Sequence, residues 1–177
     1  MLTAKKIAIL GAAIFFSFLF SPGKSFSLSD MESLRGLEGV EVLVEELNAE
    51  LENFNLTMVQ IQVDVESKLR MAGIEILSKE ENEKIQPRRK PYLYIQIHSY
   101  KPQSRRDVIA FNVDIALNQK IAIPGHPDFK KKSFYAPTWY KSIVGVVGGE
   151  KIAFIRDVVK DLTGKFTEAY LTANPKK

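Results

Sequence analysis

The hydrophobic period changes along this chain, and that change restricts the fold more than any other feature. Between Tyr92 and Val146 apolar and polar residues alternate over long stretches, which is the pattern of β-strands with one buried face. On both sides of this region apolar residues recur every three or four positions, as they do in amphipathic helices. Strands gathered in one region, with helices before and after them, predict an α+β fold.

A strand-helix-strand unit is predicted in the first half of the chain. Alternating valines favour a short strand at Val40–Val44, and Ile74–Ile76 favours a second one. Between them, Thr57 has the spacing of a helix cap, and Gly73 ends the apolar stripe of a helix. A minor helix should begin after Ser78, whose capping box includes Glu81, and end before Pro87.

Three longer strands follow and predict an antiparallel meander. They are expected at Tyr92–Tyr100, Ile109–Lys120 and Ser133–Val146, with a hairpin at Lys101–Asp107 between the first two. Pro137 cannot donate a ladder hydrogen bond. The third of these strands should therefore lie at the sheet edge or contain a bulge.

A long helix should close the fold. Apolar residues recur from Ile152 to Ala173, and Pro175 ends the pattern. The same spacing could form a coiled-coil seam in a dimer, but a helix packed on the meander satisfies the need of a sheet face to be covered. We expect helices to cover both faces of the sheet. If they do not, Tyr92, Tyr94 and Tyr100 form a stripe suited to a protein or glycan partner.

The chain begins with the layout of a secretory signal peptide. Two lysines precede an uncharged run of 14 residues, Ile7–Phe20, and the small residues Ser25 and Ser27 lie three and one positions before a possible cleavage site after Ser27. About 20 residues are needed for a membrane-spanning helix, so the run is short for an anchor. We expect residues 1–27 to be a signal peptide, residues 28–177 to be a single α+β domain, and the mature chain to lack a stable transmembrane span. A retained leader that tethers the domain is the alternative.

Composition then limits the classes of function. Three of the 25 basic residues and none of the 21 acidic ones precede residue 28, so the mature chain has a net charge of +1. A nearly neutral exported domain gives no argument for a nucleic-acid partner. The absence of cysteine excludes a disulfide framework and a lipid anchor on a thiol.

Few residues point to catalysis. His98 and His126 are far apart in the sequence and have no neighbours at the spacing of metal ligands, so we expect no metal site and no cofactor. His98 is the one candidate for acid–base chemistry, with Asp114 as a carboxylate that could approach from the neighbouring strand. An isolated imidazole is more often a structural residue than a catalytic one.

A basic surface follows from the predicted topology. The start of the first long strand and the turn after the second lie at the same end of a meander. This brings together six cations that could bind an anionic partner, such as a lipid headgroup, a lipopolysaccharide phosphate or a wall polymer: Arg88, Arg89, Lys90, Lys130, Lys131 and Lys132. The alternative is a solvated basic rim, partly balanced by nearby glutamates.

Four segments carry a resemblance to a known group of proteins: Leu34–Glu45, Asp64–Leu77, Tyr92–Ile95 and Asp157–Pro175. Together they resemble an uncharacterised family of small exported bacterial proteins, over nearly the whole mature chain. The resemblance implies no assigned activity and no catalytic residues. The order of elements is also similar to that of envelope domains, such as the amino-terminal domain of the Tol-system propeller protein and the periplasmic part of the curli secretion channel. That second likeness concerns the fold alone.

These features favour a periplasmic or secreted protein that acts by binding, as an accessory to envelope assembly or transport. Its partner would be an envelope protein or an anionic envelope component. A small periplasmic enzyme that uses His98 and a scaffold tethered by the retained leader are the alternatives.

Overall fold

The computed structural model describes residues 28–105, 107–122 and 134–175, and the predicted signal peptide lies outside them. The elements in chain order are α1 (Leu28–Leu34), β1 (Glu41–Val44), α2 (Ala49–Glu52), α3 (Met58–Met71), α4 (Lys79–Ile85), β2 (Tyr92–Tyr100), β3 (Val108–Ile121), β4 (Phe134–Gly148), a 3₁₀ turn η1 (Gly149–Lys151) and α5 (Phe154–Ala173).

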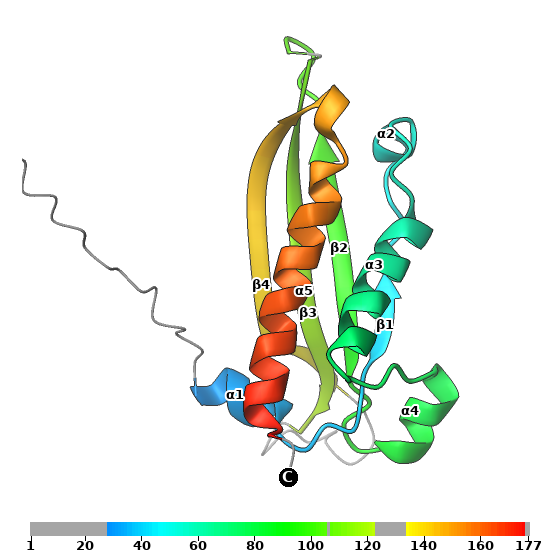
Figure 1. Ribbon diagram of the computed structural model, residues 1–177, viewed down its shortest axis with the longest axis vertical. Coiled ribbons are helices and arrows are strands. Elements are labelled where there is room, and N and C mark those ends of the chain that lie inside the picture. The colour runs from blue at the N-terminus through cyan, green and yellow to red at the C-terminus, as the bar shows by residue number, and fades with distance from the viewer. Residues whose placement is uncertain (1–27, 106, 123–133, 176–177) are drawn as a thin grey trace, which may run out of the picture.

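One mixed sheet organises the molecule (Figure 1). Its strand order is β1-β2-β3-β4, with β1 parallel to β2 and the other pairs antiparallel. The chain leaves β1, passes through α3 and α4, and returns in β2. The strands β2, β3 and β4 then form the expected meander, so the predicted α+β fold is confirmed.

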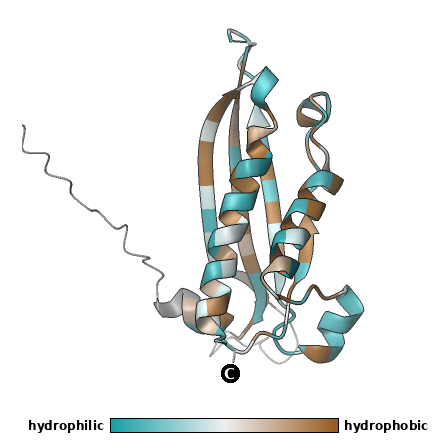
Figure 2. Ribbon diagram, in the orientation of Figure 1, coloured by the Kyte–Doolittle hydropathy of each residue, from teal (hydrophilic) through white to brown (hydrophobic). Residues whose placement is uncertain are grey.

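Helices α3 and α5 lie side by side against one face of this sheet (Figure 1). Figure 2 shows bands of hydrophobic and hydrophilic residues along the strands, because side chains alternate between the two faces. Trp139 of β4 meets Phe166 of α5 edge to face, with ring centroids 5.2 Å apart. Other residues of this single core include Ile61, Val65, Leu69, Leu93, Ile95, Val113, Ile115, Leu117, Ile155, Val159 and Leu162.

Local sequence signals set the helix starts as expected. Thr57 accepts a hydrogen bond from the Gln60 backbone and Ser78 accepts one from the Glu81 backbone, and in each case the partner side chain bonds back to the cap. Both are capping boxes, which satisfy backbone N–H groups that have no partner within the helix. The predicted beginnings of α3 and α4 are confirmed.

The expected strand at Ile74–Ile76 is not formed. Ile76 makes one parallel bridge to Val40, and the strand that pairs with β1 is β2. Gly73 has a φ of 75°, and only a few residues separate it from the cap of α4. This segment is too short to form a ladder.

Pro137 lies on an edge strand, as its missing N–H group requires. β4 is the last strand of the sheet, and the register shifts opposite Leu117 and Asn118, so that Thr138 is the additional residue of a bulge. The prediction for Pro137 is confirmed in both respects.

The expectation that helices cover both faces is wrong for the part of the chain that the structure describes. Helices α1, α3 and α5 all contact the apolar side of the sheet. On the opposite side, Tyr100, Tyr140 and Val144 are 66%, 51% and 78% exposed. The helix layer is therefore one-sided. Among the described helices, none is both long and apolar enough to span a membrane.

Candidate functional site

The uncovered side of the sheet is the main candidate surface, and we call it the open face. Strand register brings together side chains that are far apart in the sequence: Tyr94 of β2 lies opposite Ala116 of β3, which lies opposite Tyr140 of β4. The small alanine leaves space between the two rings. The open face consists of Glu41, Leu43, Tyr92, Tyr94, Gln96, His98, Tyr100, Ala110, Asn112, Asp114, Ala116, Asn118, Tyr140, Ser142, Val144 and Val146.

Tyrosine rings dominate the end of the open face where β2 begins. The Tyr92 and Tyr94 rings stand edge to face, with centroids 6.4 Å apart, and Tyr135 is tilted against Tyr92 at 5.8 Å. Burial raises the pKa of both Tyr92 and Tyr94, and the neighbouring Glu45 carboxylate raises the pKa of Tyr94 further. Both hydroxyls therefore stay protonated at neutral pH and can donate hydrogen bonds to a partner.

A hydrogen-bonded network occupies the middle of the open face. The Tyr140 hydroxyl and the Asn112 amide nitrogen each donate to the carboxylate of Asp114. Ser142 donates to the Asn112 amide oxygen at 2.9 Å. The bond to Asp114 also raises the pKa of Tyr140. These contacts hold four side chains in fixed orientations, which lowers the entropic cost of binding a partner.

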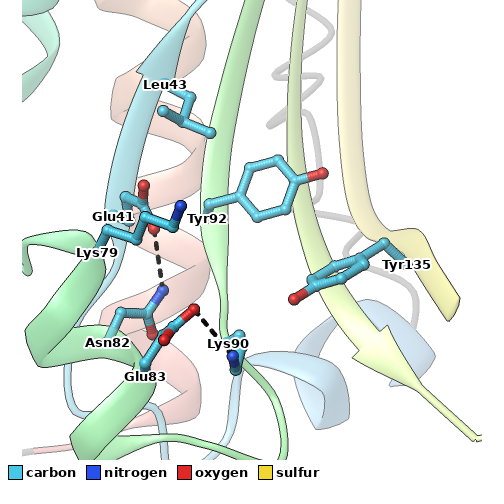
Figure 3. A pocket seen from close by; sticks show the side chains of 8 residues that line it. All are labelled: Glu41, Leu43, Lys79, Asn82, Glu83, Lys90, Tyr92 and Tyr135. Carbon is cyan, nitrogen blue, oxygen red and sulfur yellow. Dashed lines mark hydrogen bonds and ion pairs between the residues drawn. The ribbon is translucent and has the colours of Figure 1, made fainter. Parts of the chain in front are cut away.

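A small pocket of about 180 Å³ lies where the open face meets α4 (Figure 3). Asn82 is 2% exposed and donates to the Pro91 carbonyl at 2.9 Å, while Glu83 pairs with Lys90 at 3.0 Å. Pockets for drug-sized ligands measure about 300 to 1,000 Å³. This one is too small for such a ligand, and its charged lining is already paired in part.

His98 lies on the open face but lacks the partner that acid–base chemistry would need. It is paired across the strands with Asn112, whereas Asp114 is opposite Gln96. The Asp114 carboxylate is bonded to Asn112 and Tyr140, so the predicted approach of Asp114 to His98 is wrong. Among the described residues the His98 side chain forms no hydrogen bond or ion pair, and no cluster of possible metal ligands is present.

The basic cluster is only partly described. Arg89 donates to Gln119 Oε1 at 2.6 Å, to the Arg35 carbonyl at 2.7 Å and to the Ser33 carbonyl. Burial lowers its pKa, although the guanidinium stays protonated at neutral pH. Arg89 thus joins the end of α1 to the end of β3.

The other members differ in their surroundings. Lys90 pairs with Glu83, and Arg88 is exposed. Residues Lys130, Lys131, Lys132 and His126 lie outside the described residues. The described ends of β3 and β4 that flank them are at the same end of the sheet as Arg89, whose carbonyl accepts a hydrogen bond from the Lys120 backbone at 2.7 Å. Anion binding at this end stays a prediction.

Comparison with known proteins adds no assignment to this geometry. No protein-family model matches the chain, and no curated protein matches its sequence. Function must therefore be inferred from the surface itself.

Tyr140 and Ser142 are functional candidates that sequence reasoning missed. Their signal was the alternation in β4, which places them on the side opposite Trp139 and Ile143. That alternation shows which residues share a face, but it does not show that the face is uncovered.

Proposed function

We propose that this chain is an exported, non-catalytic binding protein of the bacterial envelope and that the open face of its sheet is the binding surface. The observation that supports this most strongly is the one-sided helix layer, which leaves a row of tyrosines and an ordered polar network accessible on the other side.

The composition of the open face is that of a recognition surface. Tyrosine provides a large, rigid contact area together with a polar tip, and Asn and Ser provide adaptable hydrogen bonds. Protein interfaces are enriched in aromatic residues and depleted in lysine and glutamate. On the open face, Tyr92, Tyr94, Tyr100 and Tyr140 lie among amide and hydroxyl side chains.

Charge favours a protein partner over an anionic envelope component at this surface. The ionised groups on the open face are the carboxylates of Glu41 and Asp114, with Glu45 at its border. Its cations lie at the end where β2 begins: Lys120 is on the same side of β3, and Lys79 and Lys90 line the pocket beside Tyr92. Away from that end, an anionic lipid or polymer would be repelled by the carboxylates of Asp114 and Glu45. A neutral or basic protein surface would not.

Export is part of the proposal and depends on the leader described above. The enzyme alternative loses support because His98 has no carboxylate beside it. The tethered alternative makes a separate prediction, since it requires the uncleaved precursor in the membrane fraction, whereas the proposal requires a mature chain that starts near residue 28.

Site-specific photo-crosslinking in living cells, followed by binding with purified components, tests the proposal. A photoreactive residue at position 94 samples the open face. The same residue at position 63 is the matched control, because Val63 is 56% exposed on α3, away from the open face. We expect a discrete adduct with an envelope protein from position 94 and none from position 63.

The captured protein must then bind the purified chain directly. Tyr140→Ala removes one ring and one hydroxyl from the network, and we expect at least a tenfold weaker interaction from the loss of about 1.4 kcal/mol or more at a buried aromatic contact. Equal binding by wild type and Tyr140→Ala, or crosslinks from position 63 alone, would contradict the proposal. Adducts with glycan or lipid at position 94 would reassign the partner class.

A further inference from the structure

The outer edge of β4 offers unpaired backbone groups, and their positions follow from the ladder. The Gly149 N–H donates to the Asp107 carbonyl at 3.2 Å, in register with the pairing of β3 and β4. In an antiparallel pair, hydrogen-bonded and non-bonded positions alternate. The odd-numbered residues of β4 from Trp139 to Val147 therefore bond to β3, and the even-numbered ones direct their N–H and C=O groups outward.

The other end of the strand is partly protected. Ser33 of α1 donates to the carbonyl of Thr138, the bulge residue, at 2.9 Å. Helix α1 lies at the first part of this edge (Figure 1), and Pro137 has no N–H group to offer there. From Tyr140 to Val146, no other described strand or loop pairs with the outward side.

Of the usual devices against strand pairing, the unprotected part carries one, a lysine that points inward. Natural edges are blocked by charges, prolines or bulges. Between Tyr140 and Val146 the sole charged residue is Lys141, which points to the helix side of the sheet. Val144 and Val146 are 78% and 67% exposed. A long, β-branched edge with a single charge is suited to pair with a strand that places no like charge opposite that lysine.

We propose that the Tyr140–Val146 edge pairs antiparallel with the same edge of a second copy of this chain, about a two-fold axis at Ile143, to form one continuous eight-stranded sheet. This inference is independent of the proposed partner of the open face. The pair would exchange two hydrogen bonds at each even-numbered position, and the two open faces would join into one surface.

The side chains make this edge complementary to itself. With the axis at Ile143, Tyr140 lies opposite Val146 and Ser142 lies opposite Val144, so that each tyrosine ring packs on a β-branched residue. On the helix side, Lys141 lies opposite Gly145 rather than its own copy. Gly145 is fixed by packing, because a Cβ there would lie 2.7 Å from the Phe111 ring. Like charges are therefore kept apart.

The expected interface is small. Seven residues at about 3.4 Å each, in a layer about 10 Å thick, bury roughly 500 Å² in total, which is the size of a weak and reversible contact. We therefore expect a monomer–dimer equilibrium in the micromolar range or weaker, in which the apparent mass rises with concentration.

Cysteine pairing tests the register, and the chain has no cysteine of its own to interfere. In the proposed dimer, positions 142 and 144 of different copies form a hydrogen-bonded pair with Cα atoms about 5.5 Å apart, within disulfide range. The two copies of position 142, or of position 144, lie roughly 8 Å apart, beyond the limit of about 7 Å. A mixture of Ser142→Cys and Val144→Cys should crosslink several-fold faster than either variant alone. Crosslinking at the statistical rate, or none, would overturn the proposal.

A proline variant tests the backbone pairing. Val144→Pro removes an N–H that faces outward, so β3 keeps all its bonds while the dimer loses two, one for each copy of position 144. Val144→Thr keeps the N–H and is the matched control. In sedimentation experiments on the protein as cells export it, wild type and Val144→Thr should dimerise with concentration and Val144→Pro should stay monomeric. A wild type that is monomeric at every concentration, or a Val144→Pro variant that dimerises equally, would contradict the proposal. If Val144→Pro fails to fold, the cysteine pair decides.

Discussion

Alanine substitutions of two neighbouring arginines, Arg88 and Arg89, should differ sharply in their effect on the free energy of unfolding. The Arg89 guanidinium makes three hydrogen bonds, to two carbonyls near the end of α1 and to Gln119. Gln119 is 3% exposed, so Arg89→Ala leaves its amide oxygen without a partner. A hydrogen bond to a charged donor contributes about 1.5 to 3 kcal/mol, and an unsatisfied buried acceptor costs about 1 to 3 kcal/mol.

Because the guanidinium is only partly buried, we expect a loss of about 2 to 4 kcal/mol in the free energy of unfolding for Arg89→Ala. With a urea m-value of about 2 kcal/mol per molar, the midpoint should fall by about 1 to 2 M. Arg89→Lys should be intermediate, since an ammonium cannot reproduce the planar fork. Arg88→Ala, next to it and exposed, should change stability by less than about 0.5 kcal/mol.

The assay is urea unfolding followed by fluorescence. The chain has a single tryptophan, and Trp139 is 1% exposed beside the bulge that α1 contacts. Its emission reports on the packing that Arg89 secures. Equal and small shifts for Arg89→Ala and Arg88→Ala would refute the reasoning and would return Arg89 to the set of cations that are free to bind an anion.

Three further outcomes follow from packing and titration. Gly145→Ala should lower the free energy of unfolding by about 1 to 3 kcal/mol in thermal melts, because its Cβ would lie 2.7 Å from the Phe111 ring; an unchanged melting temperature would contradict this packing. Gly164→Ala should raise stability by up to about 1 kcal/mol, since its Cβ meets only the end of a lysine side chain at 3.1 Å; a large loss would show a closer helix contact. Tyr94 has a raised pKa, so its contribution to stability is full below its ordinary pKa and is lost as the pH rises through the folded-state value. Glu45→Gln should lower the Tyr94 pKa in a spectrophotometric titration, and no change would exclude the contact between the two side chains.

Much of the fold could be predicted because local signals agreed with the packing. In β3 the residues Ile109, Phe111, Val113 and Ile115 are all buried, as their alternation indicates. Capping boxes and a proline likewise operate within a few residues. Such features depend on the neighbouring sequence and not on distant contacts.

The errors concern contacts between distant segments. Nothing near Arg89 in the sequence shows that its side chain reaches carbonyls 54 and 56 residues away. The sequence therefore suggested that Arg89 is free to bind an anion, whereas its guanidinium already has partners. Tyr92 and Tyr94 have apolar rings and polar tips, and their pattern is the same whether a helix covers them or solvent does. The open face is thus a tertiary property. Only the arrangement of α3 and α5 on one side reveals it.

The central claim is that binding takes place on the open face, and a chemical-shift map of the isotope-labelled protein with its purified partner tests it most directly. The account predicts shifts for Tyr94, Asn112, Tyr140 and their neighbours on β2, β3 and β4, with α3 unchanged. Shifts confined to the outer surfaces of α3 and α5, or to the segment around Arg88, would contradict it.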